Sequence, residues 1–193
     1  MLDSVISLIG VIILGLMPWR RGFIMVSGYT WKFLVGPQKN VSVFVSWGVV
    51  QQLLANALVV AKGFVLMQSV VFVGVNSLVG LGVGLVAHYW WDYRNNAHPA
   101  LVFLFLSGIY GALDVTVWVA FACVTMGAAF IIQSMRLGVV VGCVSVFAFI
   151  GFWGALPMLL MVNLVISILI LVLYWTVILQ YMDHGAKPLI ENG

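Results

Sequence analysis

A single arginine inside a long apolar stretch is the residue whose chemistry most needs explaining. Arg136 lies between Phe130-Ile131-Ile132 and Val139-Val140-Val141. Its guanidinium cannot lose its proton, and a charge near the middle of a bilayer costs roughly 2.5–3.5 kcal/mol on insertion scales. We therefore expect Arg136 to face water, a carboxylate on another chain, or polar groups of a neighbouring helix. The alternative is that it marks a helix end and extends to the membrane surface.

Few polar side chains could serve as partners of Arg136. The nearest acidic residue in the sequence, Asp114, lies 22 residues earlier, which is about 33 Å along a continuous helix. The uncharged candidates are Gln133, one turn before the arginine, and Asn163, on the following apolar segment. A G-x-x-x-G pair begins at Gly138 and allows another helix to approach closely, and beside the arginine it suggests a surface built to meet a partner.

Other ionisable residues offer weaker sites. Asp114 is either a carboxylate in a proton relay or water cavity, or the residue that starts a helix after Gly111. His88 lies near Asp92 and His98, so it could belong to a metal site or a pH-sensitive access point. A belt of residues at the headgroup boundary is the more typical explanation. The sequence carries no nucleophile arrangement, phosphate loop or metal signature, so we expect no catalytic site, cofactor or metal.

The composition places these residues in a membrane. Hydrophobic residues make up 64% of the 193 residues and charged residues only 7%, against about a quarter in a soluble domain. Backbone amides inside hydrocarbon must pair internally, and the apolar runs are long and do not alternate, which favours helices over a barrel. We therefore predict an all-α polytopic integral membrane protein that forms a single membrane domain over 1–193.

Charges and turn signals divide the chain into about five expected spans. In order, these are 4–19, 41–61 (ended by Lys62), 63–91, 100–150 and 155–182. Residues 22–38 mix aromatic and basic side chains, which indicates either an interfacial segment or a basic loop. A span needs only about 20 residues, so the fourth segment must bend, near Gly108–Gly111 or Gly127, or run strongly tilted. With the last segment it would form a long C-terminal helical hairpin.

Basic residues set the expected orientation. Four Lys and Arg residues lie between the first two spans, and Arg94 lies between the third and fourth. The positive-inside rule puts both loops on the cytoplasm-like side, and the net charge of +3 is therefore an orientation signal and not a nucleic-acid footprint. The amino terminus is then outside and the carboxy terminus inside, in agreement with Lys187.

The stretch Ser134-Met135-Arg136-Leu137, on a long apolar segment followed by another, resembles subunit a of the F-type ATP synthase in its mitochondrial form. That family carries its arginine in a similar context, on a long tilted hairpin that lies against the ring of c subunits. The final segment ends in Gln180-Tyr181-Met182-Asp183-His184 and is similar to the family's last helix. Upstream, Asn76-Ser77-Leu78-Val79-Gly80 is loosely similar to another family segment.

The resemblance has departures. Asn163 stands where many members have glutamate, and Ile170 stands where many have glutamine. The asparagine that the family has one turn after its arginine is Val140 here, and Ala122 lies near the position of a carboxylate that usually precedes the arginine. The similarity is carried mainly by the C-terminal part of the chain, and elsewhere by the inferred topology.

The resemblance implies a proton-translocating stator subunit without a covalent step of its own. Arg136 would separate two half-channels, and Asn163, Gln133, Asp114 and His88 would be candidates to line them. The implied partners are c-ring proteolipids, other ATP synthase subunits and lipids, in the mitochondrial inner membrane, and the chain would not function alone. Two other classes remain open: a small transporter or channel subunit whose Arg136 binds an anion, and a structural subunit of a viral or respiratory membrane assembly.

Overall fold

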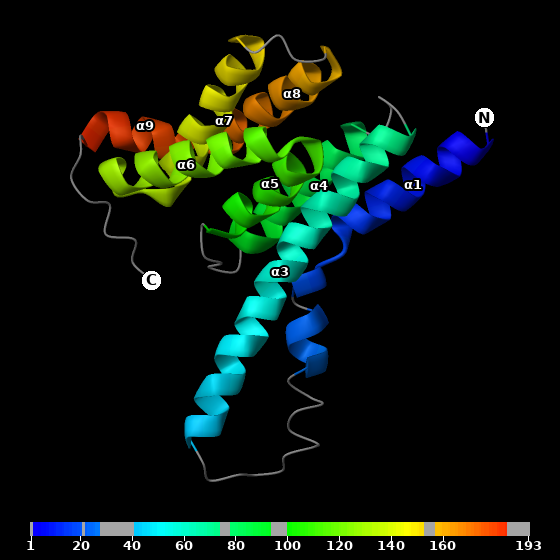
Figure 1. Cartoon of the computed structure of the whole chain (residues 1–193), viewed down its shortest axis with the longest axis vertical. Coiled ribbons are helices and arrows are strands. Elements are labelled where there is room, and N and C mark those ends of the chain that lie inside the picture. Colours follow the sequence, from blue (N-terminus) through cyan, green and yellow to red (C-terminus); the bar gives the residue numbers. More distant parts are fainter. Residues whose placement is uncertain are drawn as a thin grey trace.

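The computed structural model describes residues 2–20, 22–27, 41–73, 78–93, 100–152 and 157–184; within these ranges the chain is helical except at short breaks, and it contains no strand. The helices are α1 (Leu2–Leu16), α3 (Val41–Val73), α4 (Leu78–Tyr93), α5 (Ala100–Leu113), α6 (Val115–Ile132), α7 (Met135–Phe152), α8 (Pro157–Leu173) and α9 (Trp175–His184) (Figure 1). The predicted all-α fold is confirmed. Within the described residues, the segments long and apolar enough to cross a bilayer are Val49–Ser69, Val115–Ile132 and Met135–Phe152.

The predicted boundary at Lys62 is wrong, because α3 continues through Lys62 and Gly63 to Val73. Lys62 is buried, and its ammonium donates a hydrogen bond to the Met17 carbonyl oxygen at 3.0 Å. The same ammonium lies 5.9 Å from the centre of the Phe105 ring. A buried cation supplied with an acceptor and an aromatic face does not have to end a helix at the membrane surface.

The predicted long segment 100–150 is three helices, and its breaks do not fall at the glycines expected to bend it. Asp114, in extended backbone, ends α5 and caps α6, since its carboxylate accepts hydrogen bonds from the amides of Thr116 (2.6 Å) and Val117 (3.3 Å). Gln133 then adopts the left-handed conformation (φ 56°) that ends α6. A capping carboxylate and a left-handed residue therefore divide this segment, and Gly108, one of the glycines expected to bend it, serves another purpose.

That purpose is close packing between helices. At Gly63 on α3 an added Cβ would collide with the Phe105 carbonyl oxygen, and at Gly108 on α5 it would collide with the Val60 carbonyl oxygen. The two glycines thus face each other's helix where α3 and α5 cross. Gly138 and Gly142 on α7 play the same part against α6, so the G-x-x-x-G motif does bring in another helix, and that helix belongs to the same chain.

The predicted last span, 155–182, is a bent pair of helices: at Tyr174 the axis of α9 turns by 56° away from that of α8. The bend is held from α4. The Tyr89 hydroxyl donates to the Leu173 carbonyl oxygen at 3.0 Å, and the Tyr89 and Tyr174 rings meet edge to face with centroids 5.3 Å apart. A carbonyl at the bend thereby keeps a hydrogen-bond partner.

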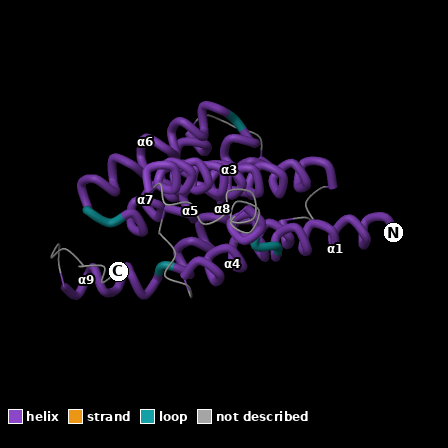
Figure 2. Tube along the Cα trace, turned by 90° about the horizontal axis from the view of Figure 1, so that it is seen from below, coloured by secondary structure: helices purple, strands orange, loops and turns teal. Residues whose placement is uncertain are grey.

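Of the predicted interfacial segment 22–38, residues 22–27 are helical and the remainder lies outside the described residues. These six residues lie against α3, where the Gln51 side-chain amide donates to the Ile24 carbonyl oxygen (3.2 Å) and to the Ser27 hydroxyl (2.7 Å). The first half of α3 extends away from the body that the other helices form (Figure 1), and Figure 2 shows the described chain as helices joined by short loops, without a strand.

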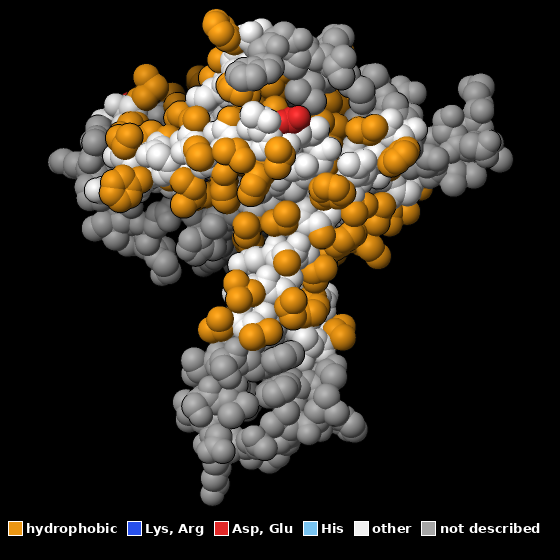
Figure 3. Space-filling model, viewed as in Figure 1, with side chains coloured by type: hydrophobic (Ala, Val, Ile, Leu, Met, Phe, Trp, Pro, Cys, Tyr) orange, Lys and Arg blue, Asp and Glu red, His pale blue; other side chains and the backbone are white. Residues whose placement is uncertain are grey.

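The core of that body is centred on α5, where Phe105, Ile109 and Tyr110 are completely buried. The surface is apolar as well. Large hydrophobic side chains such as Phe130 (86% exposed) and Phe152 (94% exposed) point outward, and apolar atoms are spread over the whole described face in Figure 3. A surface of this kind requires hydrocarbon or another apolar partner as its surroundings.

Candidate functional site

A buried polar pair joins α5 to α8. The Tyr110 hydroxyl donates a hydrogen bond of 2.5 Å to Oδ1 of Asn163, and both side chains are completely buried. Tyr110 lies three residues from the end of α5, and Asn163 lies on the second turn of α8, so the contact connects segments 53 positions apart in the sequence. Among the predicted site residues whose side chains the structure describes, Asn163 is the one that lies in the centre of the protein.

The surroundings of this pair come from α6 and α7. The Tyr110 ring contacts the Phe121 ring on α6, with centroids 4.6 Å apart. The backbone of Cys143 contributes too, because its carbonyl oxygen accepts a hydrogen bond of 3.3 Å from Ser167, one turn after Asn163. Four helices thus meet at one polar junction, which we call the Tyr110–Asn163 junction.

Several polar atoms at or near this junction are buried without a protein partner. They are the side-chain nitrogen of Asn163, the hydroxyl of Thr125 on α6 and the hydroxyl of Ser107, one turn before Tyr110. An unsatisfied buried donor or acceptor costs about 1–3 kcal/mol, and native proteins ordinarily supply such groups with internal water. The junction therefore has the chemistry of a water-binding site inside an otherwise apolar bundle.

Arg136 is not in the middle of a helix, contrary to the prediction from its apolar flanks. It is the second residue of α7, directly after the turn Gln133–Ser134, and its side chain is half-buried. Ser134 caps α7, with its carbonyl oxygen accepting from Gly138 at 2.9 Å and its hydroxyl lying 3.5 Å from the Leu137 nitrogen. Arg136 therefore lies at a helix end, as the alternative prediction had it. The turn at Gln133–Ser134 was not recognised in the sequence because apolar residues surround it.

The structure does not bring the predicted site residues into one site. Arg136 and Gln133 share the α6–α7 turn, whereas Asp114 is exposed at the other end of α6, about 27 Å away along an 18-residue helix. Cys143 lies on α7, seven residues after Arg136, and contacts Ser167 on the antiparallel α8. Asn163 lies one turn before Ser167 on α8, and is therefore one turn farther from Arg136. This puts Asn163 about 16 Å from Arg136 along the helix axes. His88 lies on α4, and its side chain is outside the described residues.

Sequence reasoning missed Tyr110, Thr125, Ser107 and Cys143 as members of a polar site. A signal was present, since Ser107 and Tyr110 are the polar side chains of an otherwise aliphatic and aromatic helix, one turn apart and so on one face. Nothing in the sequence, however, paired that face with Asn163. Among the residues that the structure describes, no group of three or more histidine, cysteine or acidic side chains could hold a metal ion.

Comparisons with known protein families, with curated proteins and with solved structures find no significant match to this chain.

Proposed function

We propose that this chain is the proton-translocating stator subunit of a rotary ATP synthase, similar to subunit a. The observation that carries the proposal is the Tyr110–Asn163 junction, a buried polar site in a helical bundle that has an apolar surface. Ionisable and polar groups inside membrane bundles are typical of ion and proton pathways. In this proposal the junction and its unpaired donors hold water in one of two proton half-channels.

Arg136 supplies the second element of the proposal. It is the only formally charged residue between Asp114 and Asp183, so it is the only permanent charge on α6, α7 and α8. Protonated carboxylates of a c-ring would give up a proton into one half-channel near Arg136, pass the guanidinium in ionised form, and take a proton from the other half-channel. Because the guanidinium stays charged, protons could not pass directly between the two half-channels.

The tilt of the helices supports this arrangement. If α6 and α7 stood upright, the turn that carries Arg136 would lie at a membrane surface. Figure 1 shows α6 steeply inclined to α3, which holds another candidate span. A bilayer whose normal follows α3 would hold α6 strongly tilted, and the turn could then lie below the surface, facing a ring. In this arrangement α6–α7 and the bent pair α8–α9 act as the tilted C-terminal hairpin.

The remaining assignments follow from this proposal. Gln133 lies beside Arg136 at the meeting point with the ring, while Asp114 and His88 are candidates for the outer ends of the half-channels. The chain would have about five spans, its amino terminus outside and its carboxy terminus on the matrix side of the mitochondrial inner membrane. Its partners would be c-type proteolipids, other ATP synthase subunits and lipids.

Gentle solubilisation followed by affinity purification, a native gel and mass spectrometry tests the assembly. We expect c-type proteolipids and soluble ATPase subunits to accompany the chain. If it is purified alone, as a homo-oligomer or within a large assembly without a rotor, the proposal is wrong. A homo-oligomer would instead favour a transporter that binds an anion at Arg136, and a non-rotary assembly would favour a structural subunit.

Substitution of Arg136 then tests the mechanism. We expect Arg136→Ala to abolish ATP-driven proton pumping in vesicles while the subunit still assembles, since no other fixed charge lies on α6–α8. Val119→Ala is a matched control, because Val119 is 47% exposed on α6 and takes no part in the proposed path. Coupled pumping by an assembled Arg136→Ala variant would refute the role of the arginine.

A further inference from the structure

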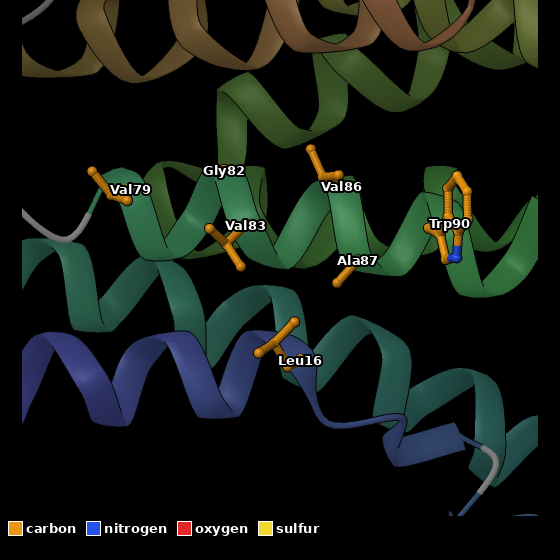
Figure 4. Close-up of a pocket in the computed structure, with 7 residues that line it drawn as sticks. All are labelled: Leu16, Val79, Gly82, Val83, Val86, Ala87 and Trp90. Atoms are coloured by element: carbon orange, nitrogen blue, oxygen red, sulfur yellow. The ribbon is translucent and has the colours of Figure 1, made fainter.

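The helical chain is interrupted directly after α1. Figure 4 shows α1 ending just past Leu16, with the chain continuing through a short loop into another helical segment. The helical conformation resumes at Trp19, and the carbonyl oxygen of Met17, inside the break, accepts the hydrogen bond from Lys62. Irregular backbone at membrane depth is tolerated where it is buried in protein or lines a cavity, and broken helices in membrane proteins commonly form ion-binding sites.

The segment after this break follows α3 in the antiparallel direction, within the candidate span Val49–Ser69 (Figure 1). Met17 contacts Lys62, and Ile24 contacts Gln51, so the two contacts are about 16 Å apart along α3. The 21 residues of the span cover about 31 Å, which matches a hydrocarbon core of about 30 Å. The residues between the two contacts therefore lie well inside the hydrocarbon layer if this span crosses the membrane.

Arg20 is one of these inner residues, and its side chain is on the α3 side. In a helix, Arg20 shares a face with Ile24 and Ser27, which are the residues that bind α3. Met25 and Val26, on the opposite face, are 61% and 67% exposed. The Nε atom of Arg20 is buried and has no hydrogen-bond partner. It is therefore a buried donor that belongs to a permanently charged group.

Two basic side chains thus lie along the same part of α3. Lys62 is 4% exposed, and its ammonium is bound to the Met17 carbonyl oxygen. Met17 is three residues from Arg20, which brings the second positive charge to the adjacent turn. The sequence contains no acidic residue between Asp3 and Asp92. Because a fixed charge at membrane depth is costly unless opposite charge or polar groups accompany it, this positive region favours an anion.

We propose that Arg20 and Lys62 bind a small inorganic anion, such as chloride, at the break after α1. The Arg20 Nε–H donates a charge-assisted hydrogen bond to the anion, while Lys62 keeps its hydrogen bond to Met17 and attracts the anion through its charge. The burial of both groups favours a small ion over a carboxylate from another protein, which would have to enter between the helices. The proposal does not depend on the rotary function.

Binding of radioactive chloride to the purified full-length chain in detergent tests the site. We expect a single saturable site for which bromide competes, and Arg20→Gln should weaken binding at least about tenfold, because a charge-assisted hydrogen bond is lost. Arg20→Lys keeps the positive charge and should weaken binding less. Arg136→Gln is the matched control, since it removes a guanidinium at the α6–α7 turn and should leave chloride binding intact.

Thermal unfolding in chloride and in gluconate at equal ionic strength gives a readout that a purely structural role would not change. Chloride should raise the unfolding temperature of the original chain, since a ligand stabilises the state that binds it, and should not change that of Arg20→Gln. A folded original chain that binds no chloride, or an Arg20→Gln variant that binds it equally well, would overturn the proposal. Chloride binding that appears only after an acidic partner protein is removed would assign the site to that partner's carboxylate instead.

Discussion

Two buried polar groups, Lys62 and Asn163, illustrate two ways in which this bundle accommodates polarity. Lys62 lies where α1, α3 and α5 meet, and its ammonium has both an acceptor, the Met17 carbonyl, and the face of Phe105. Asn163 lies where α5, α7 and α8 meet; its oxygen is bound by Tyr110, but its nitrogen has no protein partner. The Lys62 ammonium is therefore supplied with partners by the protein, whereas the Asn163 nitrogen is a buried donor that only water could supply.

This difference distinguishes buried polar groups that stabilise the fold from buried polar groups that serve a function. A satisfied buried group fixes how helices pack, and its removal should reduce stability. An unsatisfied group is costly to the fold, so its presence points to a role that the fold does not require. We therefore expect substitutions in the Lys62 region to affect stability most, and those at the Tyr110–Asn163 junction to affect transport most.

The largest expected effect is at the α3–α5 crossing beside Lys62. In Gly108→Val the new side chain would collide with the Val60 carbonyl oxygen, a backbone atom that cannot move without separating the helices. We expect a loss of about 3 kcal/mol or more, seen as aggregation or a lowered thermal midpoint in detergent. Gly127→Val is the control, since an added Cβ there meets nothing within 4 Å, and an equal loss in both variants would contradict this account.

Lys62 itself should give the next largest effect. Lys62→Met keeps the length and the apolar stem of the side chain but leaves the Met17 carbonyl oxygen without its donor. We expect a loss of about 1–3 kcal/mol of stability, measured by thermal unfolding in detergent, with Lys62→Arg retaining most of it. If Lys62→Met is as stable as the original chain, the ammonium does not anchor the end of α1.

Two substitutions of Asp114, at the α5–α6 break, distinguish a role in helix capping from a role in proton transfer. Asp114→Ala removes the acceptor for the Thr116 and Val117 amides and should cost about 1 kcal/mol. Asp114→Asn keeps an acceptor but cannot exchange protons as a carboxylate does, so comparing the two variants in unfolding and proton-pumping assays assigns the role. We expect Asp114→Asn to retain both stability and pumping, and loss of pumping at unchanged stability would instead make Asp114 a relay.

The sequence predicted the class of fold because composition alone requires internally paired backbone in a membrane. It did not predict the breaks, because Asp114 and Gln133 divide the chain through backbone conformation and side-chain capping, which hydropathy does not report. It also placed Lys62 at a helix end, since charge in an apolar run normally marks a boundary, whereas here tertiary contacts satisfy the charge. Asn163 was predicted as a polar neighbour of Arg136 and, through the resemblance, as a candidate channel residue, but its partner Tyr110 could be found only from packing.

The smallest effect on stability, and the sharpest test of the comparison, is expected from the double variant Tyr110→Phe/Asn163→Leu. Both partners of the 2.5 Å hydrogen bond become apolar groups of similar shape, and the unpaired nitrogen disappears as well. Replacing both members of a buried pair in this way is nearly neutral, so we expect thermal unfolding to change by less than about 1 kcal/mol. Tyr110→Phe alone should be more destabilising, because the Asn163 oxygen then loses its donor.

Transport should respond in the opposite way. If the junction holds water for proton transfer, the double variant removes every polar atom of the Tyr110–Asn163 pair from the path, and ATP-driven pumping in reconstituted vesicles should fall sharply in a stable protein. Ile166→Leu, a conservative change at a completely buried neighbour on α8, serves as the packing control. Unchanged pumping in a stable double variant would make Asn163 as structural as Lys62 and would remove the distinction between the two regions.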